Sequence, residues 1–149
     1  MTARPASLRP SRRAVVITLH WLTAFLLLAM LKGGTGTPVV RWTFAAAAAL
    51  WVVVALAKGL AGRPGPKLSG AARALYRPMH WGLYALLAAA AALNAAELAG
   101  LIAPGPAWIS LLVLLSAGTL HGLFHFWRHT ALRDNALRSI LPKSLHHIL

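Results

Sequence analysis

The sequence predicts an all-α membrane protein: a transmembrane four-helix bundle, N-in/C-in, with a short cytoplasmic C-terminal amphipathic segment. Of the 149 residues, 58% are hydrophobic and 11% are charged, with a mean hydropathy of +0.65; soluble domains contain roughly 25% charged residues. Four apolar runs are each long enough to cross a bilayer, which takes about 18 or more residues. Glycine and proline separate the runs. Cysteine is absent, which excludes thiolate ligands and thiol nucleophiles.

The four runs predict helices that together form a single membrane domain over residues 1–149. The turn at 33–38 ends the first run, because glycine and proline break helices. Arg41 and Trp42 are expected to anchor the second helix at the outer interface. Pro78 is tolerated in the first turns of the third helix. The expected helices are at about 14–31, 39–60, 73–99 and 107–130.

The segment after the fourth run predicts a capped amphipathic segment at the membrane surface. It covers residues 134–142, and Asp134 or Asn135 supplies the N-cap. The segment before the first run, 2–13, is polar and basic. The run that follows it is long enough to span the membrane, so we expect no cleavable signal peptide.

The basic residues are distributed unevenly. The net charge is +13, and thirteen of the fifteen lysines and arginines fall in the N-terminal tail, the middle loop or the C-terminal tail. With four spans these three segments share one side, and the positive-inside rule makes that side cytoplasmic. They also favour contact with anionic membrane lipid. No nucleic-acid partner is expected, because the basic positions flank spans and no binding module is present.

Histidines gather at the cytoplasmic ends of three predicted helices. His121, His125 and His129 follow one another at four-residue spacing, which places them along one helix face. His20 and His121 each lie roughly 10 Å inside a span, by the rise of a helix. Ionisable side chains inside a membrane are costly and indicate a functional site.

Two imidazoles at equal depth on different helices could hold one b-type haem. Arg73, Arg77 and Arg128 could pair with its propionates. Zinc is less favoured, because no carboxylate or thiolate accompanies the histidines. The alternative for a single histidine is an interhelical hydrogen bond. His125 and His129 are expected at the interface, and His146 and His147 in a polar tail.

Several of these residues occur in patterns that resemble the bacterial cytochrome b561 family. The patterns are residues 17–22 (Ile-Thr-Leu-His-Trp-Leu), His80 with Tyr84, and His121 followed by residues 134–142. This four-helix family includes superoxide oxidase and resembles the cytochrome b subunit of nickel-iron hydrogenase. The resemblance implies electron transport in a bacterial inner membrane by haem iron and a quinone such as ubiquinone. It implies His20 and His121 as inner-haem ligands, with His80 and His129 beside the haem or quinone.

The chain departs from this family in the outer half. Aligned through Lys58 and Asp134, the positions of the outer-haem ligands fall on Phe44 and Ala107, which cannot bind iron. The resemblance therefore implies one haem b near the cytoplasmic face.

The expected activity is single-electron transfer between the quinone pool and a redox partner. One alternative is a non-catalytic accessory subunit that stabilises a larger redox or photosynthetic complex. Another is a superoxide:quinone oxidoreductase, which would need an electron route from the outer face.

Overall fold

The computed structural model describes residues 11–33, 35–142, 144 and 146. It confirms the expected fold class: four long helices form a bundle, and no strand occurs in these residues. Each helix boundary lies within three residues of its predicted position. A 3₁₀ turn follows the last helix. The elements are α1 (Arg12–Gly33), α2 (Pro38–Lys58), α3 (Gly70–Leu98), α4 (Pro106–Thr130) and η1 (Ala136–Ser139).

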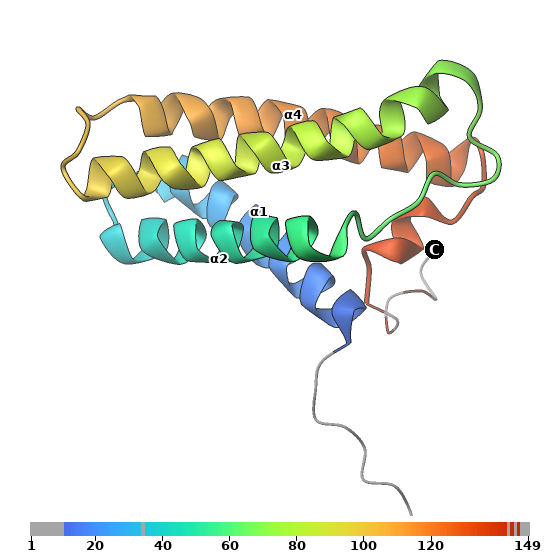
Figure 1. Ribbon diagram of the computed structural model, residues 1–149, viewed down its shortest axis with the longest axis horizontal. Helices are drawn as coiled ribbons and strands as arrows, with labels where there is room; N and C mark the ends of the chain where they lie inside the picture. Colours follow the sequence, from blue (N-terminus) through green and yellow to red (C-terminus); the bar gives the residue numbers. More distant parts are fainter. Residues whose placement is uncertain (1–10, 34, 143, 145, 147–149) are drawn as a thin grey trace, which may run out of the picture.

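The helices alternate in direction, so the bundle has two distinct ends (Figure 1). The short α1–α2 and α3–α4 connections lie at one end of the bundle, which we call the loop end. The α2–α3 loop, the start of α1 and the end of the described chain lie at the other, the terminal end. α2 packs against α1 and α3, and α3 against α4, whereas α1 and α4 touch much less. α1 crosses the bundle at an angle and diverges from α4 toward the terminal end (Figure 1).

All four helices are long and apolar enough to cross a membrane. At most a third of each apolar window is buried inside the bundle. Large side chains such as Phe25, Leu56 and Ile109 therefore face outward. An outward apolar surface on every helix fits lipid, since acyl chains are as apolar as these side chains. The protein is thus a multi-pass membrane protein.

The loop-end half of the bundle is tightly filled. Phe44, Ala48, Ala90 and Leu111 have no exposed surface, and they belong to one core that joins all four helices. Small alanine side chains let the helix backbones approach closely. Ala107 is also fully buried. Phe44 and Ala107, where the resemblance would place outer-haem ligands, are therefore part of packed protein.

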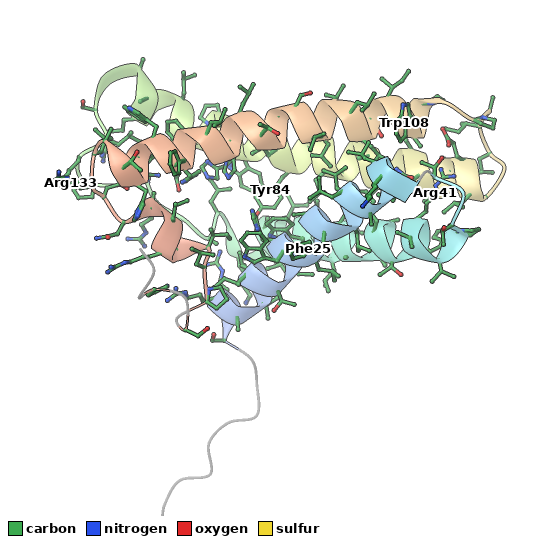
Figure 2. The ribbon with its side chains drawn as sticks, turned by 180° about the vertical axis from the view of Figure 1, so that it is seen from behind. Phe25, Arg41, Tyr84, Trp108 and Arg133 are labelled. Carbon is green, nitrogen blue, oxygen red and sulfur yellow. The ribbon has the colours of Figure 1, made fainter. Side chains whose placement is uncertain are left out.

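The position of Arg41 differs from the one expected from the sequence. It does not anchor α2 at the interface but lies buried at the loop end, where Figure 2 labels it. Its Nε donates to Asn94 Oδ1 at 3.0 Å, and one terminal nitrogen lies 2.9 Å from Glu97 Oε2. The other carboxylate oxygen of Glu97 accepts from the amides of Gly105 and Ala107. Charges within membrane-spanning helices pair inward in this way. We call Arg41, Asn94 and Glu97 the loop-end polar cluster.

At the terminal end, the C-terminal segment folds back onto α1. Trp21 Nε1 donates to the carbonyl of Ile140 at 3.1 Å, and Arg13 donates to the carbonyls of Arg138 and Leu141. Over residues 134–142 the only helix is η1, which is shorter than the predicted amphipathic segment. These bonds hold the segment against the first turns of α1.

A buried ion pair fixes the start of this segment. Arg128 Nε lies 2.8 Å from Asp134 Oδ2, and both side chains are almost fully buried. Asp134 Oδ1 accepts from the amide of Ala136, the first residue of η1, although the N-cap position itself is occupied by Asn135. Asn135 adopts a left-handed conformation and makes no side-chain cap bond.

Candidate functional site

A large cavity occupies the terminal-end half of the bundle. Its volume is about 1250 Å³, more than the roughly 300–1,000 Å³ of usual small-molecule pockets. It lies where α1 and α4 diverge, and Figure 2 shows Tyr84 between these helices. The C-terminal segment and the start of the α2–α3 loop complete its wall. Five histidines line it: His20, His80, His121, His125 and, from the C-terminal segment, His146.

His20 enters the cavity from α1 within an aromatic wall. Its ring lies 5.4 Å from that of Trp21 and 5.5 Å from that of Trp51, both edge-on. Trp51 in turn meets Tyr84 at 5.6 Å. Nδ1 of His20 is buried and has no hydrogen-bond partner among the described residues. The ring is therefore held by packing, and one of its nitrogens remains unsatisfied.

His80 enters from α3 in a defined tautomer. Its Nδ1 lies 2.6 Å from the carbonyl oxygen of Tyr76, one turn earlier. A carbonyl can only accept, so Nδ1 carries the proton and Nε2 of the neutral ring is a lone pair. That Nε2 lies 3.3 Å from Nε2 of His125 on α4. His125 therefore donates to His80.

One face of α4 alternates glycine and histidine along the cavity. Gly118, His121, Gly122 and His125 line it at spacings of three and four residues, so they share a helix face. A Cβ atom at either glycine would meet no atom of the described residues within 4 Å. A flat group in the cavity could thus approach the α4 backbone closely.

The ring of His121 lies close to the rings of both His80 and His125. Its ring centroid lies 4.9 Å from that of His80 and 4.5 Å from that of His125. Its Nδ1 is buried and unpaired within the described chain. One nitrogen from each of the three rings lies within 4.8 Å of the others. We call His80, His121 and His125 the histidine cluster.

His129 lies outside the cavity, and His146 lies at its mouth. The buried Nδ1 of His129 has no hydrogen-bond partner in the described part of the chain, and His129 does not line the cavity. His146 lines the mouth, where its Nε2 lies 3.3 Å from Arg13. His147 lies outside the described residues.

The basic residues at the cavity differ from those that the sequence indicated. Arg77 and Arg73 are exposed and do not line it. Arg128 is committed to Asp134, and its guanidinium lies 5.3 Å from the centre of the Tyr76 ring. Arg12, Arg13 and Arg138 line the cavity mouth instead. Sequence reasoning missed them as site residues, although their place in basic segments that flank helix ends was a signal.

The residues present fit a haem. His20 and His121 project into one cavity from different helices, and no described residue forms a hydrogen bond with the buried Nδ1 of either ring. Axial ligation of iron needs two such imidazoles. The mouth carries three guanidinium groups suited to carboxylates. The walls between are mostly apolar or aromatic, and the α4 glycines leave space along one side.

Fold and cavity thus define the class: a four-helix membrane protein with a histidine-lined chamber in one half. No protein-family model, curated protein or solved structure matches the chain in the comparisons with known proteins.

Proposed function

We propose that this protein is a membrane b-type cytochrome with a single haem b held between His20 and His121. It passes single electrons between a quinone in the membrane and a protein redox partner. The observation that carries the proposal is the chamber itself: about 1250 Å³, entered by His20 and His121 from different helices. The likeness of residues 17–22 and 134–142 to the cytochrome b561 family supports the same reading.

Different residues of the chain would have different roles toward a bound haem. His20 and His121 would provide the axial ligands, and a bound haem supplies a reversible one-electron change at iron. Arg12, Arg13 and Arg138 would pair with the propionates at the mouth, which orients the group. The aromatic wall and the apolar chamber exclude water, and such burial tunes the potential of a haem. By the positive-inside rule, the terminal end faces the cytoplasm of a bacterial inner membrane.

An optical spectrum tests the haem. The full chain, purified in detergent after haem supplementation, is expected to show a dithionite-reduced b-type spectrum. His20→Ala and His121→Ala each remove one axial ligand and should abolish the low-spin spectrum. His129→Ala is the matched control, because His129 is a histidine of α4 that does not line the cavity. No haem in the wild-type chain, or an unchanged spectrum in His121→Ala, would refute the assignment.

An accessory subunit of a larger redox or photosynthetic complex is the second candidate. A shallow apolar groove runs between α2 and α3, lined by small residues such as Ala46, Ala49, Ala88 and Ala92. Such faces allow another helix to pack closely. A stable stoichiometric complex in gentle detergent, whose haem does not change redox state during turnover, would favour this function.

A further inference from the structure

We infer that the histidine cluster is a binding site for a divalent transition-metal ion in the haem-free chain. His80, His121 and His125 bring one ring nitrogen each to within 4.8 Å of the others. The Nε2 atoms of His80 and His125 are already 3.3 Å apart. Two nitrogens bound to zinc at about 2.0–2.1 Å in a tetrahedral arrangement lie about 3.3–3.4 Å apart. The nitrogens of His80 and His125 are therefore already spaced as two ligands of a tetrahedral site, and rotation of the His121 ring would supply the third.

The support around His80 is typical of a metal ligand. Its Nδ1–H donates to the backbone carbonyl of Tyr76 at 2.6 Å. In metal sites the second ring nitrogen of a histidine commonly makes such a bond, which fixes the tautomer and aims the lone pair at the ion. On ion binding, His125 would replace its hydrogen bond to His80 by a metal bond. Its proton would move from Nε2 to Nδ1, so the ring stays neutral.

The ligand set selects the class of ion. Three neutral imidazoles favour zinc, cobalt, nickel or copper over magnesium and calcium, which require oxygen ligands. The two carboxylate side chains of the chain, Glu97 and Asp134, are both engaged in ion pairs, and neither belongs to the group of possible ligands among the described residues. Three protein ligands leave a fourth position open to the cavity, the arrangement found where a metal ion also binds water or a substrate.

The two sites share His121, so they compete. An imidazole that binds haem iron opposite His20 cannot also complete the histidine cluster through the same nitrogen. Haem loading is therefore expected to lower the affinity for the ion. This competition rests on the proposed function. The metal site itself depends on the cluster and stands without a haem.

Zinc and cobalt titrations of the haem-free full chain test the site. The protein carries a purification tag without histidine, and His146 and His147 are changed to alanine to remove chelation by the tail. We expect one equivalent of Zn²⁺ after dialysis and the visible absorption of four-coordinate Co²⁺. His80→Gln or His125→Gln should weaken binding more than tenfold. His20→Gln and His129→Gln should not change it.

The pattern across variants separates this proposal from the haem proposal. His20→Gln should lose haem and keep the ion, His125→Gln should lose the ion and keep haem, and His121→Gln should lose both. Circular dichroism and monodisperse elution establish that each variant is folded. If His80→Gln does not fold, His125→Gln on the other helix provides the same test. Wild-type chain without stoichiometric zinc, or folded His125→Gln with wild-type affinity, would overturn the site.

Discussion

Removal of the Glu97 carboxylate is expected to destabilise the protein by about 3–5 kcal/mol, the usual cost when a buried ion pair loses one partner. Glu97 accepts from Arg41 at 2.9 Å, from the Gly105 amide at 2.9 Å and from the Ala107 amide at 2.7 Å. The side chains of Arg41 and Glu97 are only 10% and 6% exposed. Hydrogen bonds to charged groups contribute about 1.5–3 kcal/mol each. The full sum is not expected, because Gly105 is exposed and its amide regains water.

A double-mutant cycle provides the measurement. The wild-type chain, Glu97→Ala, Arg41→Ala and the double variant are unfolded by titration with SDS in mixed micelles, followed by circular dichroism. Because each single change strands the other charge, the double variant should lose less than the sum of the two. Lys32→Ala is the control, since Lys32 is an exposed cation near the same end; its effect should stay within about 0.5 kcal/mol. A loss of under 1 kcal/mol in Glu97→Ala, or additive effects, would refute the reasoning.

Two further predictions concern glycines. Gly65→Ala would place a Cβ atom 2.5 Å from Asp134 Oδ2, so we expect a loss of about 1–3 kcal/mol from displacement of the buried ion pair. Gly82→Ala is the control: its Cβ atom would meet no described atom within 4 Å, so it should be neutral or stabilise the protein by up to about 1 kcal/mol. Thermal unfolding compares the Gly65 and Gly82 variants. Equal melting temperatures would contradict the contact between a Cβ atom at residue 65 and Asp134. Gly118→Leu would fill the chamber beside α4, so bound haem should fall several-fold at unchanged folded yield. Unchanged haem content would count against a macrocycle on this face.

The helices were predictable because the bilayer sets their length. Apolar runs bounded by glycine, proline and charge located every helix to within three residues. The burial of Arg41 was not predictable from its own run, because its partners on α3 lie more than fifty residues later. A signal was nevertheless present. Asn94 and Glu97 are three residues apart on one helix face, and a charged residue near the end of a span needs a partner.

The depth of the histidines along their helices was predictable, but the rotation of each helix about its axis was not. The four-residue spacing places His121 and His125 on one face of α4, and both line the cavity, so His125 lies in the site and not at the interface where it was expected. The rotation of α3 decides which of its residues meets them, and local sequence does not specify it. Tyr76 and Arg77 illustrate this: adjacent helical residues point about 100° apart, so Tyr76 is buried beneath the cavity while Arg77 is exposed. The position of Arg77 at the predicted cytoplasmic face therefore suggested a role that its side of the helix does not support.

The two halves of the bundle differ in a way that bears on electron transfer. At the loop end, Phe44 and Leu111 are fully buried and the polar cluster ties α2, α3 and α4 together. A second macrocycle there would have to displace close-packed side chains and break a buried ion pair. At the terminal end, α1 leaves α4 and the chamber opens. Under the proposed function, electrons would enter and leave through this half alone, which suits exchange between a quinone and a partner on one side. Superoxide oxidation at the opposite face would need a route through the packed core.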